Sequence, residues 1–125
     1  MNDYSEKKVW ITGAGKGIGR ALAKLMVQEG WVVAATSRTK EDLLSLVNEC
    51  PLDKVIAFPL DVSDHKKTIS TVRAIEKKLG KIDLVILNAG THTPMSAANF
   101  SVEQIRNLME INFMGIVHGL SLIHI

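Results

Sequence analysis

The stretch TGAGKGIG, from Thr12 to Gly19, directly follows the apolar run VWI at residues 9–11. Beyond it, apolar residues recur at helical spacing at Ile18, Leu22, Leu25 and Met26. A short strand, a glycine-rich turn and a helix are therefore predicted in succession. Glycines let the backbone approach an anion closely, and the free N–H groups at a helix start face that anion. The stretch thus predicts a phosphate site and leaves open which reaction follows.

The composition is that of a soluble globular chain. It has 125 residues, with 46% hydrophobic and 22% charged residues, which suits one domain with a single core. The net charge of +2 does not favour nucleic acid as a partner, and the apolar runs are too short to span a membrane. The N-terminus is too polar for a signal peptide, and Cys50 is the single cysteine. We therefore expect a cytoplasmic protein.

Predicted strands and helices alternate along the chain. Strands are predicted at residues 8–12, 32–36, 55–60 and 82–87, and helices at residues 17–29, 40–48, 64–79 and from 101 onward. This alternation predicts a doubly wound parallel α/β sheet of the Rossmann type, with the strands side by side in the order third, second, first, fourth. Residues 1–125 are expected to form a single dinucleotide-binding domain.

The last part of the chain suggests that this domain is incomplete. The run at residues 82–87 is apolar apart from Asp83 and predicts a strand buried on both faces, yet the predicted strand order leaves it at an edge. Ser101 and Gln104 resemble a capping box that opens the last helix. Its apolar stripe is predicted at Ile105, Leu108, Met109, Asn112 and Ile116. We expect the chain to be the N-terminal half of a protein about twice as long.

The spacing of the glycines separates this turn from two other phosphate-binding motifs. The chain lacks the common dinucleotide fingerprint Gly-x-Gly-x-x-Gly, and it lacks the Gly-Lys-Ser/Thr of a P-loop. It fits Thr-Gly-x-x-x-Gly-x-Gly, at Thr12, Gly13, Gly17 and Gly19. A turn that serves packing alone is the alternative, but packing does not need so many alternating glycines.

That pattern resembles the short-chain dehydrogenase/reductase family, and the resemblance extends from Lys7 to about Gly119. It implies that the glycine turn binds a dinucleotide through Gly13, Gly15, Lys16, Gly17, Ile18 and Gly19. Asp61 and Val62 match the position where the family's Asp meets the adenine amino group. The alternative for Asp61 is an acid near the start of a helix.

A second group of residues matches the family after the fourth predicted strand. Asn88, Ala89 and Gly90 resemble the family's Asn-Ala-Gly turn, which lies beneath the cofactor ribose, although a second Asn common there is replaced by Leu87. Asn112 matches a catalytic Asn that holds a water between the catalytic Lys and solvent. A core Asn that satisfies local backbone is the alternative.

The end of the second predicted strand indicates which dinucleotide binds. An NAD site places a carboxylate there for the ribose 2′-OH, whereas this chain has Ser37 followed by Arg38. Lys16 adds a second cation, and two cations suit the extra 2′-phosphate of NADP. NADP(H) is therefore favoured over NAD(H), with ordinary surface cations as the alternative.

The resemblance implies hydride transfer to or from a small-molecule carbonyl or alcohol, with a Ser and a Tyr-x-x-x-Lys pair. Tyr4 and Lys8 match that pair by spelling, but they precede the first predicted strand, so the true pair is expected beyond residue 125. The 125-residue fragment should then be inactive by itself. The resemblance also implies that the full-length protein is a homo-oligomer. A non-enzymatic NADP-binding sensor is the alternative, and a nucleotide-sugar epimerase fits the glycine spacing less well. His65 and His92 stand alone in polar segments, so no metal site is expected.

Overall fold

The computed structural model of the chain describes residues 6–122, and within this range four strands form one parallel sheet in the order β3-β2-β1-β4. The strands are β1 (Lys8–Thr12), β2 (Val32–Ser37), β3 (Val55–Pro59) and β4 (Leu84–Leu87). The predicted fold class and the predicted strand order are confirmed. The helices are α1 (Gly17–Gln28), α2 (Lys40–Asn48), α3 (His65–Leu79), the 3₁₀ turn η1 (Ala97–Asn99), α4 (Val102–Met109), the π-helical turn η2 (Glu110–Met114) and α5 (Gly115–Leu120).

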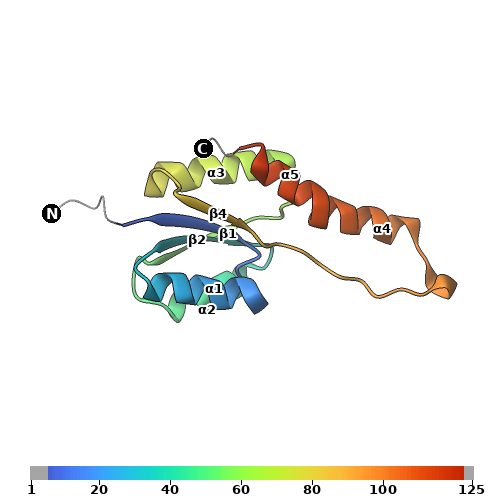
Figure 1. Cartoon of the computed structure of the whole chain (residues 1–125), viewed down its shortest axis with the longest axis horizontal. Helices are drawn as coiled ribbons and strands as arrows, with labels where there is room; N and C mark the ends of the chain where they lie inside the picture. The colour runs from blue at the N-terminus through green and yellow to red at the C-terminus, as the bar shows by residue number, and fades with distance from the viewer. Residues whose placement is uncertain (1–5, 123–125) are drawn as a thin grey trace.

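The helices cover both faces of the sheet. Helices α1 and α2 lie against one face, and α3 with α5 lies against the other (Figure 1). The register places Thr12 opposite both Thr36 and Leu87, so β1, β2 and β4 end level with one another. The loops that follow these strands therefore meet at one edge of the sheet, where ligands bind in folds of this kind.

The alternation of side chains along β1 divides the core into two clusters. Val9 and Ile11 point toward α1 and α2, whereas Trp10 points toward α3 and η2. The buried Trp10 indole donates through Nε1 to Thr36 Oγ1 at 3.1 Å, and that hydroxyl donates to the Ile11 carbonyl at 3.2 Å. The buried indole N–H of Trp10 and the buried hydroxyl of Thr36 therefore both have hydrogen-bond partners, as buried polar groups normally do.

Two predicted apolar faces differ from the observed ones. In α1, Leu22 and Met26 pack against the core as the helical spacing predicted, but Ile18 and Leu25 are 80% and 53% exposed. The fully buried residues of this helix are the small Gly19 and Ala23. The prediction that β4 is buried on both faces holds only in part. Ile86 packs against one core cluster and Val85 against the other, but both are half-buried and Leu84 is 40% exposed at the open edge. Within the described range, β4 has a strand neighbour on one side, and this leaves its other side uncovered.

The last helix begins as predicted but buries a different face. The Ser101 hydroxyl accepts from the Gln104 N–H at 3.2 Å, so Ser101 is the N-cap of α4. The predicted stripe through Ile105 and Met109 is exposed, at 38% and 52%. The residues that are buried belong to η2 and α5, namely Ile111, Gly115, His118 and Gly119. No helix among residues 6–122 combines the length and the hydropathy needed to cross a bilayer.

Candidate functional site

A cleft of about 510 Å³ lies at the carboxyl ends of the strands. Its walls come from the glycine turn after β1 and from the segments that follow β2, β3 and β4. The predicted site residues that line it are Gly13, Gly15, Lys16, Ile18, Ser37, Arg38, Asp61, Val62, Asn88, Ala89 and Gly90. The fold thus brings together residues that lie far apart in the sequence.

The glycine turn is packed so closely that side chains at two positions would collide with backbone. A Cβ on Gly13, whose φ is +67°, would lie 2.8 Å from the Ala89 Cα. A Cβ on Gly19 would lie 2.2 Å from the Gly13 carbonyl oxygen and 2.6 Å from Asn88 Nδ2. Gly17 and Gly19 do not line the cleft, and Gly19 instead lets α1 start directly against the turn.

Asn88 ties the end of β4 to the glycine turn. Its Nδ2 donates to the carbonyls of Thr12 and Gly13, each at 3.2 Å. The Ala89 N–H donates to Thr12 Oγ1 at 3.0 Å, and the Ala14 N–H donates to the Thr36 carbonyl at 3.0 Å. The floor of the cleft is therefore fixed by hydrogen bonds between neighbouring strand ends.

Sequence reasoning selected two cations, Arg38 after β2 and Lys16 before α1, and it missed one acid, Asp42, in the first turn of α2. Arg38 is exposed on the cleft wall, next to the half-buried Ser37. Lys16 Nζ lies 3.7 Å from Oδ2 of Asp42, although Asp42 does not line the cleft. That oxygen is buried and accepts no hydrogen bond within residues 6–122. Nothing in the local sequence signals this contact, because Asp42 approaches Lys16 from the first turn of α2.

Asp61 and Val62 form the wall that follows β3. Asp61 Oδ1 accepts from the Ser63 N–H at 3.0 Å and from the Ser63 hydroxyl at 2.7 Å. The helix-capping role belongs to Asp64, whose Oδ1 accepts from the Lys67 N–H at 3.0 Å. Asp61 therefore stays in the loop, exposed on the cleft.

Val62 is held from behind by α5, a contact that the sequence did not predict. His118 donates through Nδ1 to the Val62 carbonyl 2.9 Å away, because a carbonyl oxygen can only accept. The ring of His118 stacks on that of His65, with the centroids 4.5 Å apart. The prediction that His65 stands alone is therefore wrong, since α3 and α5 bring the two rings together.

Asn112 lies in the π-helical turn and does not line the cleft. The prediction that it sits on an apolar stripe is wrong, because it is exposed. Its side chain accepts from the Thr91 N–H at 2.7 Å and donates to the Thr91 carbonyl at 2.8 Å. Thr91 is a cleft residue, so Asn112 fixes the cleft wall that follows Gly90. Sequence reasoning also missed the lining residues Thr39, Leu60, Thr91, His92 and Ile111.

Tyr4 lies outside the described residues, so the structure does not address its pairing with Lys8. The prediction that the true Tyr-x-x-x-Lys pair lies beyond residue 125 stays a prediction.

A family model and two curated relatives match this chain, and their descriptions name dehydrogenases or oxidoreductases. The family model described as short chain dehydrogenase matches residues 7–124. An oxidoreductase of Botryotinia fuckeliana is 36% identical over 89% of this chain and 41% of its own length. The meso-2,3-butanediol dehydrogenase of Serratia marcescens is 32% identical over 91% of this chain and 45% of its own length.

A solved structure matches over a similar span. The 3-ketoacyl-(acyl-carrier-protein) reductase of Brucella melitensis, complexed with NADH, has a TM-score of 0.85 and 27% identity. The match covers 92% of this chain and 47% of that one. The chain thus spans less than half the length of each of these proteins.

Proposed function

This chain belongs to the short-chain dehydrogenase family, and on that premise we propose that the full-length gene product is an NADP(H)-dependent oxidoreductase. Its reaction would move a hydride between the nicotinamide and a carbonyl or alcohol carbon of a small molecule. The names of two relatives support this reaction class, because one is a butanediol dehydrogenase and the other a ketoacyl reductase.

The observation that carries the proposal is the close packing of the glycine turn, which we call the glycine cradle. Side chains on Gly13 and Gly19 would collide with the neighbouring backbone, and a Cβ on Gly15 would lie 2.8 Å from Ser37 Oγ. This cradle leaves backbone exposed on the cleft at the start of α1, where N–H groups have no intrahelical partner. A pyrophosphate fits that place, with the adenosine between the β2 and β3 ends near Arg38 and Asp61.

The preference for NADP(H) rests on charge at the end of β2. Ser37 occupies the position where an NAD site has a carboxylate, and Arg38 and Lys16 both line the cleft. A guanidinium can bind a phosphate through two parallel hydrogen bonds. Asp42 lies behind the turn and offsets part of the Lys16 charge. We therefore assign the larger share of the preference to Arg38.

The residues of this chain would bind and orient the cofactor. When bound, NADPH supplies the hydride. Asn88 would hold the floor of the cleft, and Asn112 would hold the wall at Thr91 on the side of the nicotinamide. We keep the catalytic role of Asn112 as part of the proposal, together with a Ser and a Tyr-x-x-x-Lys pair in the full-length protein.

Equilibrium titration of the full-length gene product with NADPH and with NADH tests the proposal. We expect NADPH to bind at least about tenfold more tightly, which is about 1.4 kcal/mol. Arg38→Ala should remove most of that difference, because it deletes the charged hydrogen bonds to the 2′-phosphate and leaves NADH binding unchanged. Titration by quenching of protein fluorescence measures both affinities.

Lys40→Ala is the matched control. Lys40 is an exposed cation close to Arg38 in sequence, but it does not line the cleft. Its removal should leave the ratio of the two affinities as it is in the wild type. An NADPH-to-NADH ratio that Arg38→Ala does not change would contradict the assignment.

A further inference from the structure

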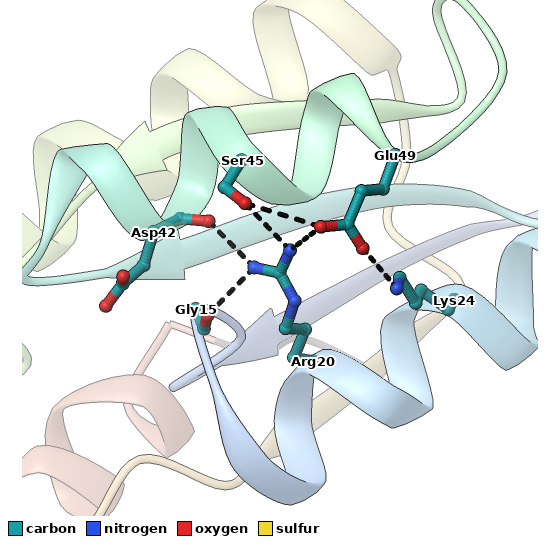
Figure 2. Close-up of polar contacts among 6 residues, drawn as sticks. All are labelled: Gly15, Arg20, Lys24, Asp42, Ser45 and Glu49. Atoms are coloured by element: carbon teal, nitrogen blue, oxygen red, sulfur yellow. Dashed lines mark hydrogen bonds and ion pairs between the residues drawn. The ribbon is translucent and has the colours of Figure 1, made fainter.

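Arg20 connects the glycine turn to helix α2 through a four-way set of hydrogen bonds (Figure 2). Its Nη1 donates to the Gly15 carbonyl at 3.1 Å and to the Asp42 carbonyl at 3.0 Å. Its Nη2 donates to Ser45 Oγ at 3.0 Å and to Glu49 Oε2 at 2.7 Å. The Arg20 side chain is 20% exposed. One guanidinium thus joins the phosphate turn to successive turns of α2.

The outer end of this set is itself held in place. Glu49 also pairs with Lys24, which lies one helical turn beyond Arg20 on α1. Lys24 and Arg20 hold the pKa of the Glu49 carboxyl below its usual value, through hydrogen bonds and charge. The carboxylate therefore stays ionised near neutral pH and keeps the guanidinium oriented toward α2.

The bond to Gly15 sets the direction of a peptide group that faces the cleft. In a planar trans peptide the carbonyl and the N–H point in opposite directions. Because the Gly15 carbonyl points at Arg20, the N–H of Lys16 in the same peptide group is turned away from Arg20. Gly15 and Lys16 line the cleft, whereas Arg20 does not.

We propose that Arg20 is a positioning residue for the dinucleotide: it fixes the Gly15–Lys16 peptide so that its N–H is directed to the phosphate side of the cleft. The inference rests on the proposed function, and it adds a residue that acts on both dinucleotides alike. Arg20 lies behind the turn and would not touch the 2′-phosphate. Lysine cannot replace it, because an ammonium is a single point charge and cannot span acceptors on two elements.

The test compares Arg20→Met with Lys24→Met in the full-length gene product. Lys24→Met is the matched control, because Lys24 pairs with the same Glu49 from the same helix but does not contact the turn. For Arg20→Met we expect the dissociation constants of NADPH and NADH to rise together, each about tenfold, which is about 1.4 kcal/mol. The ratio of the two constants should stay at its wild-type value. Lys24→Met should change neither constant by more than about twofold.

A second measurement does not depend on any ligand. Hydrogen exchange in the ligand-free protein reports the backbone of residues 13–20, in which the Ala14 N–H donates to Thr36 and the Arg20 N–H to Lys16. Arg20→Met should speed exchange in this peptide, and Lys24→Met should not. If Arg20→Met does not fold, Arg20→Lys carries both measurements, with the same direction of change expected.

Several results would overturn the inference. Exchange and affinity that match the wild type would show that Arg20 only joins two helices, and a changed NADPH-to-NADH ratio would show that it reaches the 2′-phosphate. A wild-type protein that binds neither dinucleotide would refute the proposed function instead. In that case the exchange data would still decide whether Arg20 holds the turn.

Discussion

Single residues of the glycine turn do different things, and their neighbours show which. Gly19 is needed for space, because its Cα faces the Gly13 carbonyl and the Asn88 amide. Gly17 has an open surrounding but a φ of +61°, so it is needed for backbone conformation. The sequence predicted a glycine-rich phosphate turn. The steric need for Gly13 and Gly19, however, depends on Asn88 and Ala89, which lie far along the chain.

Asp42 is a charged residue whose position near Lys16 could not be predicted from the sequence. Sequence reasoning noted that Ser37 replaces a carboxylate and that no acid follows until Glu41. The first turn of α2 nevertheless brings Asp42 to within 3.7 Å of the Lys16 ammonium. Its Oδ2 is buried, with no hydrogen bond from the described residues. A negative charge at this place opposes the phosphate that Lys16 would attract.

We therefore predict that Asp42→Asn tightens NADPH binding. Lys16 is 81% exposed, and its ammonium lies too far from Asp42 for a hydrogen bond. Asp42 therefore does little to orient the Lys16 side chain, and its main effect on a nearby phosphate is charge repulsion. The expected gain is roughly fivefold, or about 1 kcal/mol, with NADH affinity unchanged. Calorimetric titration of both dinucleotides measures it. Glu41→Gln, an exposed acid next in sequence, is the control and should have no effect.

Among the elements, the pair α1 and α2 depends on charge as well as on apolar packing. Leu43 and Leu46 of α2 and Ala23 of α1 supply the buried contacts. The exposed side of the pair is joined by Arg20, Lys24 and Glu49. The sequence predicted both helices with nearly the observed bounds, but it could not match residues of α1 to residues of α2.

This arrangement predicts a dependence of stability on pH. Because Lys24 and Arg20 lower the pKa of Glu49, the folded state binds its proton less tightly than the unfolded state does. The contribution of Glu49 is thus present above its unfolded pKa of about 4.3 and is lost as the pH falls through the lower folded value. Glu49→Gln should be less stable than the wild type at pH 7, and the two should converge toward pH 3.

Urea unfolding at several pH values between about 3 and 7 measures this convergence. Glu29→Gln is a suitable control, since Glu29 is an exposed acid just after α1. A gap between wild type and Glu49→Gln that stays constant over the whole range would contradict the assigned cause.

The last helix shows where element prediction fails. Its N-cap was predicted correctly from local residues, because Ser101 and Gln104 are neighbours in sequence. Its buried face was not predicted correctly, because the helix has several apolar residues and those that become buried depend on which other elements pack against it. The π-helical turn at Glu110–Met114 also shifts the helical period, so that Asn112 faces Thr91.

At the scale of the whole molecule, strand alternation was enough to predict the sheet order, because parallel strands with helical crossovers allow few topologies. The open edge at β4 follows from that order. Beside it, a groove of about 620 Å³ is lined by residues of β4, α3 and the segment after α5, among them Leu84, Val72 and Leu122. Leu120 at this groove is 57% exposed.

We predict that the 125-residue chain by itself associates through this edge as its concentration rises, because unpaired strand groups and apolar side chains are exposed together. Leu84→Lys should lower the association constant at least about tenfold by placing a charge on the edge. Leu52→Lys is the control, since Leu52 is 87% exposed and lies outside this groove. Sedimentation velocity over a concentration series measures both variants. Equal association of the two variants would rule out the β4 edge as the contact.

The parallel register has a consequence for how the protein is made. Strands β1, β2 and β3 with their two connecting helices end at Pro59, so they can pair as soon as that segment has left the ribosome. Strand β4 pairs Leu84 with Val9 and joins later, over a long separation in sequence. Only then does Asn88 reach the carbonyls of Thr12 and Gly13. During translation, therefore, the strand ends beside Arg38 can form before Asn88 fixes the floor of the cleft. The proposed phosphate site would become rigid only when Asn88 arrives.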